Sequence, residues 1–315
     1  MKIKNYILLV IIIIVLVCST ACAFNKTKKE PEENDENVEP QINVFEMKNF
    51  ISNITFDTPK ESGPIINTPW ENDSNFKKVQ EEHGTDVLLA AFATVLKSTL
   101  PGEQHNVHLA TNSVSGIIIP PGHVFSQNKS IGPYVKSKGY KEGSAYIGGV
   151  VTPSIGGGVC KIASTLYNVA ILSNLEIIER HNHGMPINYL PYGQDATVAY
   201  GSKDLRFKNN TGFPILIWAI PIENTIYMAF YGKEKPPKVE WQHNILEKKE
   251  TTVQYRINPD LKKGEEKIII EGMNGARVES SINIEYPDGT SEKKNLGISF
   301  YHPMPYIIEV KNKSR

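Results

Sequence analysis

One cysteine near the middle of the chain has the surroundings of a nucleophile. Cys160 follows Gly156, Gly157 and Gly158 and opens an apolar segment with helical spacing. Glycines let the backbone turn tightly and keep side chains away from the first turn of the helix that follows. Free N–H groups and the helix dipole at that turn favour a thiolate over a thiol, so we expect Cys160 to be reactive.

Candidate partners for this thiol follow on successive predicted strand ends. His181 and His183 come first, and Asp195 and Asp204 come later. A Cys on a helix, a His on a strand and an Asp on a later strand follow the order found in transglutaminase-like and other papain-type cysteine enzymes. In such a site the His shares a proton with the thiol, the Asp fixes its tautomer, and donors at the helix start hold an oxyanion. Our candidate catalytic set is Cys160, His183 and Asp204, with His181 and Asp195 as alternates.

Two other interpretations of Cys160 stay open. Free cysteines are often small buried hydrophobic residues, and glycines before a helix can serve only close packing on a sheet. Cys160, His181 and His183 could instead bind zinc with a carboxylate, but no CxxC or HExxH spacing supports this, so we expect no metal and no cofactor. A phosphate-binding loop is discarded because GGGVCK lacks the Gly-Lys-Ser/Thr ending.

The elements that must position these residues indicate an α+β domain. Three helices are predicted, over Thr85–Ser98, from Glu103 to about Val114, and over the segment CKIASTLYNVAILSN that begins at Cys160. Short β-prone runs between turn residues predict a mainly antiparallel sheet that ends near Gly232. The last six of these runs are LEIIER, PINYLP, ATVAYG, DLRFKN, PILIWAI and TIYMAFYG.

A small all-β module is predicted after this domain. The segment KEKPPK indicates a linker, which we place over residues 233–247. Beyond it, YPDGTS predicts a hairpin turn at Asp288 and Gly289, and strands are expected to about Val310.

The start of the chain has the tripartite form of a bacterial secretory signal. Lys2 and Lys4 precede an apolar run that is too short to span a bilayer comfortably, and small residues lead to Cys22. We therefore predict a lipoprotein signal peptide over residues 1–21. Lipidation of Cys22 would anchor the chain to the outer face of the cytoplasmic membrane, and an uncleaved anchor helix is the alternative.

Residues 22–83 are predicted to be a tether and an irregular lead-in. The segment from Asn25 to Pro40 is charged and has no aromatic residue, so it cannot bury enough apolar surface to fold. Residues 41–83 show no clear hydrophobic period and can pack on the domain that starts at residue 84.

Composition suits globular domains and gives no sign of a nucleic-acid partner. The chain has 315 residues, of which 40% are hydrophobic and 22% charged. Its 34 basic and 34 acidic residues balance, and loss of Lys2 and Lys4 leaves a net charge of about −2. Two of the three cysteines lie in the leader, so Cys160 cannot form an internal structural disulfide.

Two long stretches resemble the VanW family: PPGHVFSQNKSIGPYVKSKGYKEG, and GGGVCKIASTLYNVAILSNLEIIERHNHGMPINYLPYGQDATVAYGSKDLRFKNNT. The resemblance implies a VanW domain over residues 84–232 that works in the cell envelope. Two residues depart from the family pattern, since Lys161 stands where Gln is usual and Tyr134 where Arg is usual. The tail, residues 248–315, resembles the G-five domain, which implies an auxiliary module that binds cell-wall glycan.

Taken together, the residues and the resemblance imply an envelope-anchored lipoprotein that recognises or remodels peptidoglycan or an attached wall polymer. Its expected partners are cell-wall glycan or peptide and, through the N-terminal lipid, the membrane. Two alternatives stay open: a cysteine-dependent amide hydrolase or transpeptidase acting on peptide stems, and a non-catalytic scaffold for an envelope enzyme. Gly132, Pro133, Tyr140 and Lys208, with the three glycines before Cys160, are the candidate binding residues.

Overall fold

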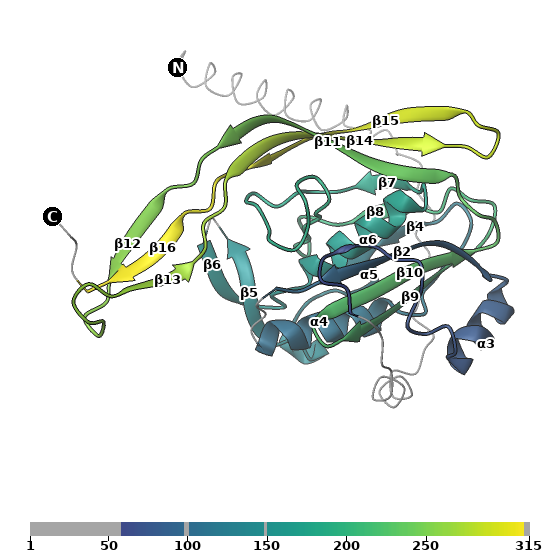
Figure 1. Cartoon of the computed structure of the whole chain (residues 1–315). Coiled ribbons are helices and arrows are strands. Elements are labelled where there is room, and N and C mark those ends of the chain that lie inside the picture. Colours follow the sequence, from purple (N-terminus) through teal and green to yellow (C-terminus); the bar gives the residue numbers. More distant parts are fainter. Residues whose placement is uncertain (1–57, 98–100, 148–149, 312–315) are drawn as a thin grey trace, which may run out of the picture. The chain divides into compact units, whose positions relative to one another are not determined.

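The computed structural model describes residues 58–97, 101–147 and 150–311 of the chain (Figure 1). The predicted signal peptide, the lipidation site Cys22 and the charged tether lie outside the described residues. In the described part of the chain, no helix is both long and apolar enough to cross a membrane.

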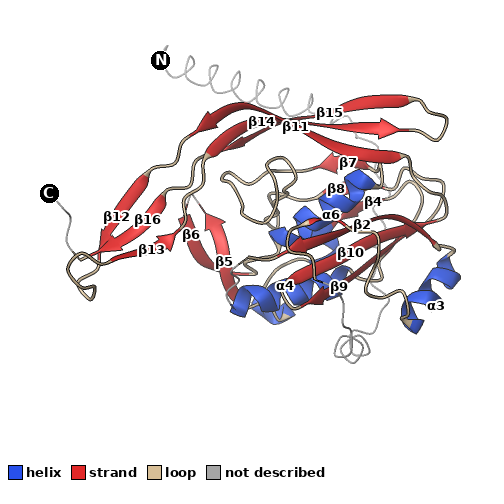
Figure 2. Ribbon diagram, in the orientation of Figure 1, coloured by secondary structure: helices blue, strands red, loops and turns tan. Residues whose placement is uncertain are grey.

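An antiparallel five-stranded sheet forms the centre of the described fold (Figure 2). Its strand order is β1 (Gly63–Pro64), β2 (Val87–Val95), β10 (Thr225–Gly232), β9 (Ile215–Ile222) and β3 (Ile118–Ile119). Alternate side chains of β9 and β10 point to opposite faces, and all of them are buried because both faces are covered.

Helices cover the two faces of this sheet. The described helices are α3 (Ser74–His83), α4 (Pro101–Val114), α5 (Gln127–Ile131) and α6 (Cys160–Leu172), with a short 3₁₀ turn η2 (Lys136–Lys138). The core between the sheet and the helices α4 and α6 contains Phe92 and Ile217. On the opposite face α3 packs through Phe76, whose ring lies 5.2 Å from the Trp218 ring between centroids.

Two smaller antiparallel sheets complete the domain that carries Cys160. One has the order β4 (Val124–Ser126), β8 (Arg206–Lys208) and β7 (Glu176–Glu179), and the other pairs β5 (Glu142–Ile147) with β6 (Val150–Ile155). The β5–β6 ribbon leads directly into the glycines that precede α6.

The C-terminal region is all β, as predicted. One three-stranded sheet has the order β11 (Lys238–Lys249), β14 (Gly275–Glu285) and β15 (Ser291–Tyr301), and another has the order β12 (Val253–Ile257), β16 (Tyr306–Val310) and β13 (Glu266–Ile270). The predicted YPDGTS turn joins β14 to β15, and Asp288 Oδ1 accepts a hydrogen bond from the Thr290 N–H at 2.9 Å.

Strands β11 and β14 pack on α6. Val239 and Ile282 belong to the same hydrophobic cluster as Ile162 and Leu166 of that helix. Trp241 of β11 meets Tyr167 of α6 edge-on, with 5.7 Å between ring centroids. The C-terminal strands therefore share a core with the domain that carries Cys160.

The α+β class is confirmed, but the helix predicted over Thr85–Ser98 is wrong, because this segment forms strand β2. Phe92 of β2 lies in the core under α6, whereas Ala91 and Ala93 lie in the core on the α3 side. A strand that is buried on both faces loses the polar–apolar alternation, and an apolar run of this length fits either element.

Three further local predictions are corrected. The irregular lead-in contains the helix α3, which Asp73 caps by accepting from the N–H groups of Asn75 and Phe76. The linker predicted over residues 233–247 is mostly strand, since β11 begins at Lys238. PINYLP and ATVAYG are loops instead of strands, apart from one isolated bridge between Ala199 and Lys203.

Candidate active site

One face of α6 holds a loop in place through polar side chains. Cys160, Ser164 and Asn168 are spaced by four residues, so they share a face of the helix. Ser164 exchanges two hydrogen bonds of 3.0 Å with the backbone of Ala196, and Asn168 Nδ2 donates to the Gln194 carbonyl at 2.7 Å. Because this loop bonds to helix side chains, it needs no neighbouring strand, which explains why ATVAYG is not one.

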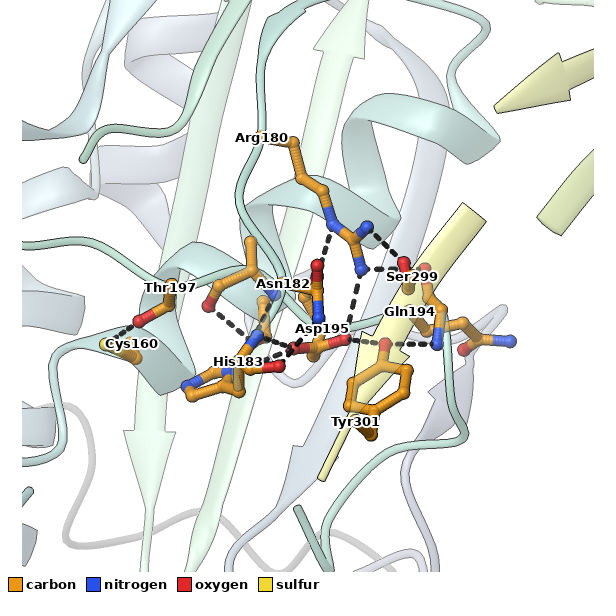
Figure 3. A network of polar contacts seen from close by, with 12 residues as sticks. Cys160, Arg180, Asn182, His183, Gln194, Asp195, Thr197, Ser299 and Tyr301 are labelled. Atoms are coloured by element: carbon orange, nitrogen blue, oxygen red, sulfur yellow. Dashed lines mark hydrogen bonds and ion pairs between the residues drawn. The ribbon is translucent and has the colours of Figure 1, made fainter. Parts of the chain in front are cut away.

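Asp195 lies between Gln194 and Ala196, whose carbonyls bond to α6, and its side chain pairs with His183 (Figure 3). His183 Nδ1 lies 2.7 Å from Asp195 Oδ2, and the same oxygen accepts the His183 backbone N–H at 2.7 Å. Asp195 is fully buried, with 0% of its surface exposed. The bond from Nδ1 to Asp195 fixes the orientation of the ring and leaves Nε2 as the ring nitrogen available to the thiol.

The Cys160 thiol is half-buried at the first position of α6. Its Sγ lies 3.3 Å from Thr197 Oγ1 and accepts the Val198 N–H at 3.4 Å. Burial raises the pKa of the thiol, but the neighbouring His183 and these two hydrogen-bond partners outweigh it, so the pKa lies below its ordinary value. The site therefore favours a thiolate.

The imidazole of His183 has the complementary shift. Burial lowers its pKa, but the hydrogen bond to Asp195 and the interaction with Cys160 outweigh burial and raise the pKa to about 9. The two opposite shifts both favour a thiolate beside an imidazolium over a neutral thiol beside a neutral imidazole, the pairing that a cysteine nucleophile with its own acid needs.

Two residues from elsewhere in the chain hold the second oxygen of Asp195. Oδ1 accepts a hydrogen bond from Tyr301 Oη at 2.5 Å and another from Arg180 Nη2 at 3.0 Å. Burial raises the pKa of Asp195, but His183 and Arg180 outweigh it and keep the pKa below its ordinary range. The carboxylate is ionised and carries no proton to give.

The structure replaces Asp204 with the alternate Asp195 as the partner of His183. Asp204 instead accepts from Ser126 Oγ at 2.5 Å and from the Asn128 N–H at 3.0 Å, at the start of α5. It is therefore a structural carboxylate of a helix start.

The alternate base has a different partner as well. His181 Nε2 pairs with Glu179 Oε1 at 2.9 Å, and its side chain is more than one-third exposed. His183 is consequently the histidine that the fold brings to the thiol.

The glycines before α6 are explained by close packing. Gly156 and Gly158 have φ of 78° and 104°, a region that favours glycine. A Cβ on Gly157 would lie 2.3 Å from the carbonyl carbon of Gly143 in β5. A binding role for these glycines stays a prediction.

The other candidate binding residues lie in different surroundings. Gly132 and Pro133 are joined by a cis peptide bond next to α5. Tyr140 is buried and meets Tyr134 edge-on at 5.5 Å between centroids, so it packs in the core and does not line an open groove. Lys208 lies in β8, between β4 and β7.

Sequence reasoning missed several residues of this site. Ser164 and Asn168 could have been found, since they are polar residues at four-residue spacing after Cys160 in the same helix. Arg180 and Tyr301 carry no such signal, because more than a hundred residues separate them and only the tertiary fold brings both to Asp195.

Cys160, His183 and Asp195 lie in the part of the chain that matches a known family. Residues 102–231 match the family model described as VanW like protein, so the chain carries a VanW-family domain and the resemblance is confirmed. The chain is 31% identical over 162 residues to "Uncharacterized protein YoaR" of Bacillus subtilis (strain 168), covering 50% of this chain and 54% of that protein. It is 29% identical over 136 residues to "Vancomycin B-type resistance protein VanW" of Enterococcus faecalis (strain ATCC 700802 / V583), covering 42% of this chain and 50% of that protein. The chain thus spans about half the length of these curated relatives.

Solved structures of G5 domains are similar to part of the chain. The IgA1 protease G5 domain is 22% identical, covering 26% of this chain and 98% of that chain, with a TM-score of 0.16. HP0197-G5 is 16% identical, covering 23% and 97%, with a TM-score of 0.14.

Proposed function

We propose that the chain is a cysteine-dependent acyl-transfer enzyme of the bacterial cell envelope, which hydrolyses or transfers amide bonds in the peptide stems of peptidoglycan. The arrangement of Cys160, His183 and Asp195 carries this proposal. A nucleophile at a helix start, a base beside it and a carboxylate that orients the base are the three parts that such chemistry needs.

The proposed reaction runs in two steps. The Cys160 thiolate attacks the amide carbonyl carbon, a C–S bond forms, and the C–N bond breaks as His183 Nε2 gives its proton to the leaving amine. His183 then takes a proton from water or from an acceptor amine, which attacks the thioester and releases the thiolate. Water yields a carboxylic acid and an amine yields a new amide.

An envelope setting is supported from two sides. One relative is named for vancomycin resistance, and the first 22 residues have the form of a bacterial lipoprotein leader. Recognition of wall polymer without chemistry is the competing function, and it requires neither a thiolate nor the buried His183–Asp195 pair.

The decisive experiment follows the fate of peptide stems. A chain with Cys18→Ser and Cys22→Ser, in which Cys160 is the only thiol, is incubated with cross-linked muropeptides and analysed by mass spectrometry. We expect amide cleavage or exchange together with an acyl adduct on Cys160, and loss of both in Cys160→Ala. Turnover that survives Cys160→Ala would contradict the proposal.

A matched histidine pair sharpens this test. Loss of the base in His183→Ala should lower turnover by about 100-fold or more, as is typical when a general acid–base is removed. His181→Ala is the control, because its ring pairs with Glu179 on the outside of the site and should leave turnover near that of the parent.

Alkylation of Cys160 tests the same site without a substrate. Because the pKa of the thiol is lowered, iodoacetamide should label Cys160 faster below pH 8.5 than it labels a free thiol of ordinary pKa, about 8.5. His183→Ala should move the midpoint of labelling upward, because the neighbouring positive charge is lost. Slow labelling that speeds up only on unfolding would mean that Cys160 is buried packing.

We also propose that the mature chain is lipid-anchored through Cys22. Small residues lead to this cysteine after the apolar run, and a charged segment without aromatic residues follows it. Cys22→Ser should abolish acyl labelling in bacterial cells and release the protein from the membrane fraction, whereas unchanged labelling would place the anchor elsewhere.

A further inference from the structure

The C-terminal strands supply a hydrogen-bond donor to Asp195, the buried carboxylate of the candidate site. Tyr301, the last residue of β15, donates its hydroxyl to Asp195 Oδ1 at 2.5 Å, and the same hydroxyl accepts the Gly193 N–H at 2.7 Å. Tyr301 is only 3% exposed. One buried hydroxyl therefore fixes both the carboxylate and the loop on which it lies.

Arg180 makes a second connection from Asp195 to β15. Its Nε donates to the Asp195 carbonyl at 2.7 Å, its Nη2 to Asp195 Oδ1 at 3.0 Å, and its Nη1 to Ser299 Oγ at 2.7 Å (Figure 3). Ser299 and Tyr301 are two residues apart, so they lie on the same face of the strand. That face of β15 contacts Asp195 through Tyr301 and Arg180 through Ser299, on the side of Asp195 away from His183.

Further bonds hold this strand end in register with the loop of the histidine. Asn182 Nδ2 donates to the Phe300 carbonyl at 2.8 Å, and the His302 N–H donates to the Gly184 carbonyl at 2.9 Å. The residues on both sides of His183 are thus tied to the end of β15.

We propose that Tyr301 is a positioning residue for the Cys160 chemistry and that β15 is a structural part of the active site. This inference rests on the proposed function. The C-terminal module then has a role in the reaction itself, because it holds Asp195 in the geometry that orients His183, in addition to any contact that it makes with the cell wall.

The chemistry of the hydroxyl agrees with a neutral donor. Burial and the charge of Asp195 both raise the pKa of Tyr301, so the phenol keeps its proton across the working pH range. A phenylalanine at this position would keep the packed ring and remove only the donor to Asp195 and the acceptor for Gly193.

Tyr301→Phe therefore isolates the positioning role, and the sign of its effect is diagnostic. A pure charge effect would make Asp195 more basic on loss of a donor, strengthen its hold on the His183 proton and speed Cys160 labelling at low pH. If Tyr301 instead positions Asp195, its loss loosens the His183–Asp195 pair and slows the labelling of Cys160. We expect labelling at pH 6.5 and kcat to fall about tenfold, with KM little changed, as follows when a hydrogen bond to a charged group is lost.

Two companion variants complete the test in the full chain that carries Cys18→Ser and Cys22→Ser. Ser299→Ala removes only the acceptor of Arg180 Nη1 and should slow labelling about threefold. Tyr192→Phe is the control, because its ring contacts Tyr301 at 5.1 Å between centroids while its hydroxyl donates to the Asn274 carbonyl, outside the site. It should label at the parental rate.

The outcomes separate the two proposals. The proposed function stands if the parent labels fast and His183→Ala labels slowly. The positioning role is overturned if, in that case, Tyr301→Phe and Ser299→Ala both label at the parental rate or faster. Slow labelling in the parent would overturn both. If Tyr301→Phe does not fold, the labelling rate of Ser299→Ala alone decides the positioning role.

Discussion

At the scale of single residues, Asp195 is a fully buried carboxylate with hydrogen-bond donors on both of its oxygens. Each of its two carboxylate oxygens accepts two hydrogen bonds: one from the His183 ring and one from the His183 backbone on Oδ2, and one each from Arg180 and Tyr301 on Oδ1. A buried carboxylate is tolerated only with such partners. The same partners make Asp195 a firm support for His183.

We predict that Asp195→Asn lowers the free energy of unfolding by about 3 kcal/mol at pH 7, because Arg180 is then buried without an ionised partner. The pKa of Asp195 is lowered in the folded state. Its contribution is therefore fully present above the unfolded value of about 3.9 and is lost as the pH falls through the lower folded value.

Urea unfolding of the parent and of Asp195→Asn between pH 7 and pH 3 measures this effect. The difference in the free energy of unfolding between parent and variant should keep its full size down to about pH 5 and shrink below about pH 4. A difference that stays constant down to pH 3 would mean that the charge of Asp195 contributes nothing to stability.

The sequence could predict two residues of the proposed site, Cys160 and His183, but not which aspartate pairs with the histidine. Cys160 and His183 are marked by residue type and by the glycines before the helix. Asp195 and Asp204 both follow the histidines at predicted strand ends, so order along the chain could not decide between them. The choice depends on Ser164, whose bonds to the neighbouring Ala196 hold the Asp195 loop against α6.

At the scale of elements, a buried ion pair links α4 to α6. Lys161 Nζ donates to Glu103 Oε1, and both side chains are about one-tenth exposed. Burial lowers the pKa of Lys161 to about 8, so the folded protein pays a desolvation penalty to keep this lysine charged. We therefore predict that the pair aligns the two helices and contributes little net stability.

A double-variant cycle tests that statement. Lys161→Met leaves Glu103 buried and unpaired and should lower the free energy of unfolding by about 3 kcal/mol. Adding Glu103→Leu replaces the whole pair by apolar side chains and should restore stability to within about 1 kcal/mol of the parent. A double variant less stable than Lys161→Met, measured by urea unfolding, would show that the pair is a net stabiliser.

The close packing of the α6 start on β5 yields a second element prediction. Gly157→Ala brings a Cβ to 2.3 Å from the carbonyl carbon of Gly143, so the two backbones must separate. We expect a loss of about 1–3 kcal/mol in stability and slower labelling of Cys160, because the first turn of α6 is displaced. Gly212→Ala is the control, since nothing lies within 4 Å of its Cβ.

The elements themselves were predictable where local preference and tertiary environment agree. Strand β10 contains Thr, Ile, Tyr and Phe, which favour strands, and the sequence predicts it as a strand. Strand β2 contains mostly Leu and Ala, which favour helices, yet it is an interior strand of the sheet, between β1 and β10. Its conformation is imposed by pairing with a distant partner, which a local window cannot show.

At the scale of the whole molecule, the C-terminal strands and the domain with Cys160 share one core. The Pro-rich segment KEKPPK suggests a boundary, and composition alone carries no information on contacts beyond it. In the structure Val239 and Ile282 enter the core around α6, and Trp241 packs on Tyr167. Shared core residues couple the unfolding of the elements that contribute them.

We predict that Ile282→Ala destabilises the described unit as a whole. Ile282 is 2% exposed in β14 and lies in the core around α6, so its truncation should cost about 3 kcal/mol through lost burial and the cavity left behind. Differential scanning calorimetry should show one main transition that moves to lower temperature, and Cys160 should become accessible to alkylation at that same lower temperature. Ile298→Ala in β15 is the matched control, because Ile298 is 45% exposed and its truncation removes little buried surface. Two transitions, of which Ile282→Ala moves only the one without Cys160, would mean that the C-terminal strands fold independently and that their contacts with α6 form only after each part has folded.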